Sequence, residues 1–207
     1  MPHDYNKLRQ TLIHLRAKQD PKQMQRGALL MRGRLFTWLN AYRSRLKELG
    51  RRHQPLHIAA YSALAHEPDL APLLWQWVED EGLTISLPCV AAENSPLVFK
   101  PWREDSVMKT AAFGIQEPDT EEIAPTPDIM LIPTLGFSRT GDRLGYGKGY
   151  YDRTLALLQE KNHEVITIGI GWAVGDLSPY DYHPAAHDQP LHSVLTDKGW
   201  AVPAPTL

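Results

Sequence analysis

Apolar residues recur at helical spacing through the first quarter of the chain. A stripe of this kind predicts a helix over residues 4–18, and its members are Leu8, Leu12 and Leu15. Pro21 interrupts the pattern. A longer helix is predicted over residues 22–50, with apolar positions at Leu30, Leu35, Leu39, Tyr42 and Leu46. The chain therefore begins with two helices.

After Pro55 the pattern changes to short, continuous apolar runs. Such runs are typical of strands that are buried on both faces of a sheet, and they occur at residues 57–61, 83–87, 128–133 and 165–171. Asp69 is predicted to cap a helix that ends at Gly82. The strand–helix–strand order of this region predicts a parallel pair with a right-handed crossover. A further helix is expected over residues 150–159.

The remaining segments show little periodicity. Residues 95–127 are rich in proline, with short strands possible near residues 97–99, and the proline-containing tail is expected to be extended or looped. Together these patterns predict one three-layer α/β/α domain over residues 1–207, Rossmann-like and with a mostly parallel sheet. The helices at 4–50 would precede an α/β core at 56–200. Ligands of such sheets bind beyond the carboxyl ends of the strands.

Composition narrows the class of protein. The chain has 207 residues, a net charge of −2, 43% hydrophobic and 22% charged residues, as expected of an ordinary globular domain. Cys89, the single cysteine, excludes an internal disulfide and is interpreted as a buried thiol. The N-terminus has no signal-peptide pattern and no apolar run reaches the length of a membrane span. We therefore expect a cytoplasmic protein, a monomer, with no membrane partner.

The predicted second helix carries many arginines, which raises the hypothesis of a nucleic-acid module. Acidic residues elsewhere cancel this charge, and no aromatic stacking platform accompanies the basic face. A solvated helix face is the simpler interpretation. No nucleic-acid partner is expected.

The segment 143–153 is the most informative part of the chain. It reads RLGYGKGYYDR, in which alternate glycines bracket Lys148 and leave backbone N–H groups open to a ligand. Arg143 and Lys148 suit phosphate, and Asp152 is a hard oxygen ligand of the kind that Mg²⁺ takes beside phosphates. The segment predicts an anion-binding loop that leads into a helix. A tight structural turn with surface charges is the alternative, because the loop is neither a P-loop nor a complete dinucleotide fingerprint.

Four other clusters could meet the loop at the same edge of the sheet. Two arginines on one helix face could bind phosphates, an acidic residue after the first strand could accept N–H groups, aromatic residues could stack on a flat ring, and a second aspartate could share a metal. Each also has a plain structural interpretation as a surface, turn or core residue. The arginines are Arg9 with Arg16, and the acidic residue is in the segment from Tyr61 to Glu67. The aromatic residues are Trp102 with residues 113–118, and the second aspartate is Asp188, next to His187.

These residues together resemble the signature of the 5-formyltetrahydrofolate cyclo-ligases, also called methenyltetrahydrofolate synthetases. The resemblance is most specific in residues 133–153 and extends over nearly the whole chain. Supporting matches are Leu8-Arg9 with Arg16, Glu67, the FGIQEP segment at 113–118, Gly169 to Gly171, His187-Asp188 and Thr196.

The resemblance implies a defined reaction. Members of this family use ATP and Mg²⁺ to convert 5-formyltetrahydrofolate to 5,10-methenyltetrahydrofolate, with release of ADP and phosphate. The formyl oxygen takes the γ-phosphoryl group, N10 attacks the activated carbon, and phosphate leaves. Such chemistry needs positioning and cations around the developing charge more than covalent help from the protein.

The same resemblance assigns roles to residues of this chain. It implies Arg143 and Lys148 as catalytic cations and Asp152 with Asp188 as ligands of Mg²⁺. The ATP site it implies comprises Tyr5, Arg9, Arg143, Leu144, Gly145, Tyr146, Gly147, Lys148, Gly149, Tyr150 and Tyr151. The folate site it implies comprises Tyr61, Ser62, Glu67, Trp102, Phe113, Glu117 and Tyr151.

Three positions depart from the family pattern. Tyr5 replaces a lysine expected at the triphosphate, Ser138 replaces an aspartate, and His192 replaces an acidic residue. These departures keep open a second hypothesis, a non-catalytic relative that binds folate or nucleotide with a weakened ATP site. A sugar-phosphate enzyme on a similar scaffold is a third, because a fold does not determine function.

Overall fold

A seven-stranded sheet lies at the centre of the protein. The computed structural model describes residues 5–51, 55–185 and 188–206. In the order β11-β10-β9-β6-β1-β2-β3, neighbouring strands are parallel except at the two edges, where β3 and β11 run antiparallel. The strands are β1 His57–Ala59, β2 Thr84–Cys89, β3 Val98–Trp102, β6 Ile129–Pro133, β9 Ile166–Ile170, β10 Ser193–Thr196 and β11 Gly199–Val202.

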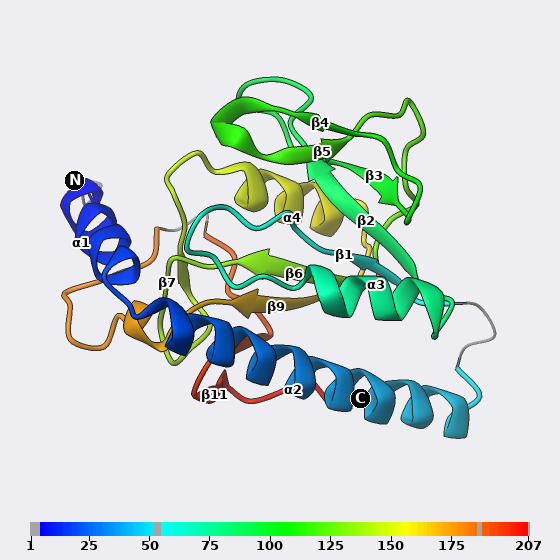
Figure 1. The fold of residues 1–207 in the computed structure, drawn as a ribbon, viewed down its shortest axis with the longest axis horizontal. Helices are drawn as coiled ribbons and strands as arrows, with labels where there is room; N and C mark the ends of the chain where they lie inside the picture. Colours follow the sequence, from blue (N-terminus) through cyan, green and yellow to red (C-terminus); the bar gives the residue numbers. More distant parts are fainter. Residues whose placement is uncertain (1–4, 52–54, 186–187, 207) are drawn as a thin grey trace.

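Helices cover both faces of this sheet, which confirms the predicted three-layer α/β architecture. Helices α2 and α3 lie over one face and α4 lies over the other (Figure 1). The bounds are α1 Asn6–Ala17, α2 Pro21–Glu48, α3 Ala71–Glu79 and α4 Tyr150–Glu160. Short elements complete the fold: β4 Met108–Thr110, β5 Gln116–Pro118, β7 Gly136–Phe137, β8 Arg143–Leu144, and the 3₁₀ turns η1 Ala112–Gly114 and η2 Ala173–Gly175.

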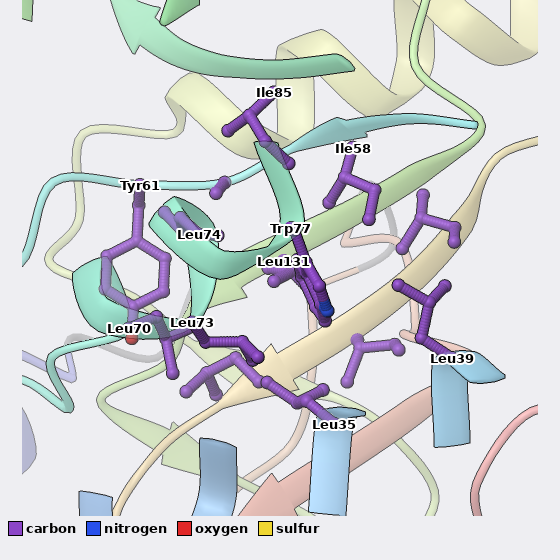
Figure 2. Packing of buried hydrophobic residues seen from close by; sticks show 14 of the residues in the cluster. Leu35, Leu39, Ile58, Tyr61, Leu70, Leu73, Leu74, Trp77, Ile85 and Leu131 are labelled. Atoms are coloured by element: carbon purple, nitrogen blue, oxygen red, sulfur yellow. The ribbon is translucent and has the colours of Figure 1, made fainter. Parts of the chain in front are cut away.

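The apolar strand runs are explained by burial on both faces. Ile58 and Leu131 point toward α2 and α3, where they pack with Leu35, Leu39 and Trp77 (Figure 2). Their sequence neighbours project to the opposite face, because successive strand residues alternate. These neighbours pack against α4 and include Ala59, Met130 and Ile132 with Leu155 and Leu158.

Helix α1 departs from its predicted apolar stripe. Leu12 is buried, but Leu15 is 37% exposed and the neighbouring Arg16 is only 4% exposed. In α2, Leu30, one of the apolar positions noted in the sequence, is 44% exposed, whereas Met31 is buried. The stripe prediction was wrong at Leu15, because a one-residue step rotates a helix face by about 100° and the partner surface decides which face is covered.

Two loop predictions also needed correction. The tail contains two strands, β10 and β11, and the proline-rich segment 95–127 contains β4 and β5 in addition to β3, which bears out the strand expected near residues 97–99. The edge strand β11 and the two-stranded sheet of β4 and β5 are short and show weak alternation, which hides them in sequence. Asp69 lies one position before the N-cap of α3, which is Leu70, although its side chain does accept the N–H of Ala71.

The described helices include none that is long and apolar enough to cross a membrane.

Glycine substitutions should have opposite effects at two positions. Gly141 has φ of +92°, and an added Cβ would lie 2.4 Å from the carbonyl oxygen of Leu191. We expect Gly141→Ala to lower the free energy of unfolding by about 3 kcal/mol. Gly33 lies within α2 with no atom within 4 Å of an added Cβ. Gly33→Ala should therefore raise the free energy of unfolding by about 1 kcal/mol. Urea titration of both variants measures these changes, and equal effects would contradict the account.

Candidate active site

The carboxyl ends of adjacent parallel strands bring the candidate residues to one edge. Strand β1 pairs with β6, and the segments that follow them carry residues 60–67 and the glycine loop. Helix α1 closes this edge, because Leu12 packs against Leu135, Leu144 and Leu177. The first helix thus reaches the two segments that sequence analysis selected.

The glycine loop, residues 145–149, joins β8 to α4 as predicted. Gly147 and Gly149 have φ of +89° and +66°, which L side chains rarely adopt, and Gly149 is the N-cap of α4. The first N–H groups of a helix have no partner within it and favour an anion. The conformation of the loop therefore suits phosphate as well as a turn.

Cations surround this loop. Arg9 donates from Nε to the carbonyl oxygen of Gly145 at 3.0 Å, and its guanidinium borders Gly147. Lys148 is exposed, and its carbonyl oxygen accepts from Arg153 at 2.7 Å. Arg153 also lies 5.1 Å from the ring centroid of Tyr150. The loop thus presents positive charge at the N-terminus of α4.

Arg143 and Asp152 are partners of one another. Arg143 is 8% exposed and forms an ion pair with Oδ1 of Asp152. Its guanidinium lies 5.7 Å from the ring centroid of Tyr151, and its carbonyl oxygen accepts from the Tyr182 hydroxyl at 3.1 Å. The predicted phosphate cation and the predicted metal ligand therefore neutralise each other in this arrangement. Sequence reasoning treated the two roles separately.

Glu67 is held by residues from three elements. Oε1 accepts from the Tyr146 hydroxyl at 2.8 Å and lies 3.9 Å from Nη1 of Arg16. Oε2 accepts the N–H of Leu64 at 2.9 Å, which closes a tight turn. Arg16 in turn donates to Tyr146 and to the carbonyl oxygen of Thr134, both at 2.8 Å. The carboxylate is buried but both paired and hydrogen-bonded.

The negative charge of Glu67 affects the pKa of three tyrosines. Burial raises the pKa of the Tyr61, Tyr146 and Tyr151 hydroxyls above the usual range, and the nearby carboxylate raises each further. Arg16 opposes the rise of the pKa at Tyr146, and Arg143 opposes it at Tyr151. All three hydroxyls stay protonated at neutral pH. Tyr61 donates to the carbonyl oxygen of Pro68 at 2.6 Å.

Two neighbouring cavities share Leu64 and Ala65 in their walls. The larger, of about 420 Å³, brings together four predicted folate residues, which are Tyr61, Ser62, Glu67 and Trp102. The smaller, of about 240 Å³, is lined by Ile13, Arg16, His66 and Tyr146 in addition to the shared pair. An apolar pocket with a few convergent polar groups is typical of a small-molecule site.

Other predicted residues lie elsewhere or outside the described atoms. Glu117, in β5, is buried and accepts the N–H of Val90 at 3.1 Å, so it does not line either cavity. The side chain of Phe113 and the whole of His187 lie outside the described residues. Tyr5 exchanges hydrogen bonds with the backbone of His183 and packs on Tyr182 with ring centroids 5.0 Å apart.

Asp188 lies in a turn, where its Oδ2 accepts the N–H of Ala185 at 2.8 Å. Burial raises the pKa of the Tyr182 hydroxyl, and the negative charge of Asp188 raises it further; this hydroxyl donates to the carbonyl oxygen of Arg143. Within residues 5–51, 55–185 and 188–206, no three acidic, histidine or cysteine side chains gather as a metal cluster. Mg²⁺ needs only one or two carboxylates when phosphates supply the other oxygens, so a metal held by Asp152 and Asp188 does not require such a cluster and stays a prediction.

Several functional candidates were missed at the sequence level. Tyr182 lies in a segment without periodicity and no motif marks it, whereas His66 lies within the selected segment from Tyr61 to Glu67 but was given no role. His66 adopts φ of +65° and its carbonyl oxygen accepts from the indole of Trp172 at 2.8 Å. A left-handed residue in a cavity wall is a structural signal that a sequence does not carry.

Cys89 should react slowly with alkylating reagents. The thiol is 4% exposed, and burial, with the nearby Glu117 carboxylate, raises its pKa to about 11. Since only the thiolate is nucleophilic, we expect iodoacetamide at pH 8 to modify the native protein about 100-fold more slowly than the urea-unfolded chain. Mass spectrometry over time measures both rates, and equal rates would contradict a buried structural thiol.

Comparison with known proteins places these features in context. The family model described as the 5-formyltetrahydrofolate cyclo-ligase family matches residues 3–197. A 5-formyltetrahydrofolate cyclo-ligase of Mycolicibacterium smegmatis is 31% identical over 95% of both chains. The enzyme of the same name from Escherichia coli K12 is 28% identical over 72% of this chain and 75% of its own length.

Solved structures show the same fold. The 5,10-methenyltetrahydrofolate synthetase of Aquifex aeolicus superposes with a TM-score of 0.69 at 24% identity, covering 97% of this chain and 94% of that one. The synthetase of Mycoplasma pneumoniae gives 0.68 at 20% identity, covering 94% and 99%.

Proposed function

Because this chain belongs to the 5-formyltetrahydrofolate cyclo-ligase family, we propose that it converts 5-formyltetrahydrofolate to 5,10-methenyltetrahydrofolate, consuming ATP and releasing ADP and phosphate. The observation that carries the proposal is the contact between the glycine loop and the larger cavity. Tyr146 of the loop donates to Glu67, whose side chain lines that cavity. A phosphate site and a flat-ring site would therefore adjoin.

The nucleotide phosphates would lie on the glycine loop. The first N–H groups of α4, which have no partner within the helix, and the exposed Lys148 offer donors and positive charge, and Arg9 adds a second cation beside Gly147. Asp152, with Asp188, would hold Mg²⁺, which supplies charge neutralisation of the phosphates when bound. Binding there requires Asp152 to share its carboxylate between the metal and Arg143.

The reduced folate would occupy the larger cavity. Tyr61 and Trp102 provide aromatic surface for a planar ring, and Ser62 adds a hydroxyl. Each oxygen of Glu67 accepts one hydrogen bond from the protein, and a carboxylate oxygen has a second lone pair for an N–H of the pterin. Tyr151, at the start of α4, would contribute a further aromatic ring to the folate site.

The reaction would then proceed in two displacements. The formyl oxygen attacks the γ-phosphorus, the bond to the β,γ-bridging oxygen breaks, and ADP leaves. N10 attacks the formyl carbon and loses its proton to solvent, and the C–O bond breaks with release of inorganic phosphate. Lys148 and the loop N–H groups would stabilise negative charge on the transferred phosphoryl group, and this charge stabilisation is the main demand of phosphoryl transfer.

A methenyl-formation assay tests this proposal. The purified chain is mixed with 5-formyltetrahydrofolate and Mg²⁺, with and without ATP, and the absorbance of the methenyl product is followed. We expect product only with ATP, and ADP in equal amount. A non-catalytic folate-binding relative is the second candidate, favoured by Tyr5, which presents an aromatic ring to Tyr182 where the family has a lysine. Tight folate binding without product in a single turnover would support that relative and overturn the enzyme.

A further inference from the structure

Tyr146 has an unusual position for a side chain in a loop of glycines. Its flanking residues are Gly145 and Gly147, and Gly147 has φ of +89°. Glycines leave a backbone free to move unless other contacts hold it. This part of the loop is held to its surroundings by the hydrogen bond from Arg9 to the Gly145 carbonyl oxygen and by the hydrogen bonds that the Tyr146 hydroxyl makes with Arg16 and Glu67.

The hydroxyl of Tyr146 joins two anchored partners. It accepts from Nη1 of Arg16 and donates to Oε1 of Glu67, each at 2.8 Å. Arg16 is also fixed to the Thr134 carbonyl oxygen, and Glu67 is also fixed to the Leu64 N–H. The Tyr146 hydroxyl therefore links the glycine loop, helix α1 and the turn after β1.

Core packing does not explain this arrangement. Tyr146 is 42% exposed, whereas Arg16 and Glu67 are 4% and 8% exposed. The polar end of an exposed ring is thus inserted between two buried charges, and the ring itself forms part of the smaller cavity. A tyrosine needed only for stability would bury its ring, which carries most of its hydrophobic contribution.

We propose that Tyr146 is a positioning residue that couples the two ligand sites, because its hydroxyl holds the glycine loop against the Glu67 turn. The inference rests on the proposed function, in which the loop binds nucleotide and the turn borders the folate cavity. A ligand that orders either segment then removes part of the ordering cost for the other ligand. Such coupling is reciprocal and typically changes affinity by about 5- to 150-fold.

The test compares nucleotide affinity with and without folate. Calorimetry measures the dissociation constant of a non-hydrolysable ATP analogue, with Mg²⁺, in the presence and absence of 5-formyltetrahydrofolate. In the unchanged protein we expect 5-formyltetrahydrofolate to lower the dissociation constant of the analogue by about tenfold. In Tyr146→Phe, which removes only the hydroxyl, the factor should fall to about 2 or less, and amide exchange of residues 145–149 should quicken.

The control is Tyr42→Phe, which removes the same atom from a tyrosine of α2 that packs on Trp38. It should retain the tenfold factor. Tyr146→Phe should melt a few degrees lower than the unchanged protein, because Arg16 and Glu67 each lose a hydrogen bond, but both variants should be folded at the temperature of the binding measurement. Equal coupling in Tyr146→Phe and the unchanged protein overturns the inference while leaving the proposed function intact, as does the absence of coupling in the unchanged protein. Failure of the unchanged protein to bind either ligand overturns the proposed function itself.

Discussion

Lys148→Ala is expected to lower the rate of ATP-dependent methenyl formation by about 10²- to 10³-fold, the loss typical when one charge-stabilising group is removed. Lys148 is exposed at the centre of the glycine loop, beside the start of α4. Arg143 cannot easily replace it, because that guanidinium is buried and paired with Asp152. Steady-state kinetics with the methenyl absorbance measures the effect.

Two further variants make the result specific. Lys148→Arg keeps the positive charge and should recover part of the activity, since arginine also binds phosphate. Lys161→Ala removes an exposed lysine at the other end of α4 and should leave the rate unchanged. Thermal melting should not distinguish these three variants by more than about 2 °C. Near-normal turnover in Lys148→Ala would refute the phosphate role of the loop.

Arg16→Ala should be the most destabilising of the charge-removing substitutions, with a loss of about 3–5 kcal/mol in the free energy of unfolding. Arg16 is 4% exposed and compensates the buried Glu67 carboxylate at 3.9 Å. Its removal also takes away the hydrogen bond to the Thr134 carbonyl oxygen and one of the two hydrogen bonds of the Tyr146 hydroxyl. Calorimetric melting should show a decrease of roughly 10 °C for a domain of this size.

Two further variants distinguish loss of the ion pair from loss of side-chain volume as the cause of the lower free energy of unfolding. Arg26→Ala removes an exposed arginine of α2 and should change stability by less than about 0.5 kcal/mol. The double variant Arg16→Ala with Glu67→Gln removes the uncompensated charge and should be more stable than Arg16→Ala alone. If the two substitutions were instead additive, the ion pair would not be the source of the destabilisation.

Local patterns predicted most of the fold. The apolar runs that became β1, β2, β6 and β9 were recognised because strands buried on both faces are continuously apolar. The strands β10 and β11 were missed because the tail has prolines nearby and little alternation. Leu15 was expected in the core, but Arg16 is buried in its place, because the edge to which α1 binds offers hydrogen-bond acceptors.

The candidate site was predicted in its residue types more than in its contacts. Tyr61, Ser62 and Glu67 were selected as one cluster and Trp102 in another, and all four lie around one cavity. Glu117 was also predicted in the folate site, but its carboxylate accepts a hydrogen bond from the backbone N–H of Val90. The spacing of the chain did not distinguish these outcomes, since the residues come from the segment after β1, from β3 and from β5.

The sequence by itself determined the α/β class, the anion-suited loop and its family, because periodicity and glycine spacing are local properties of a chain. Only the tertiary structure decided that Arg143 pairs with Asp152, that Arg16 is buried, and that Tyr146 joins the loop to Glu67. These contacts connect segments that are distant along the chain. Their existence depends on how α1 and the strand ends meet at one edge of the sheet, and that meeting is set by packing of the whole domain.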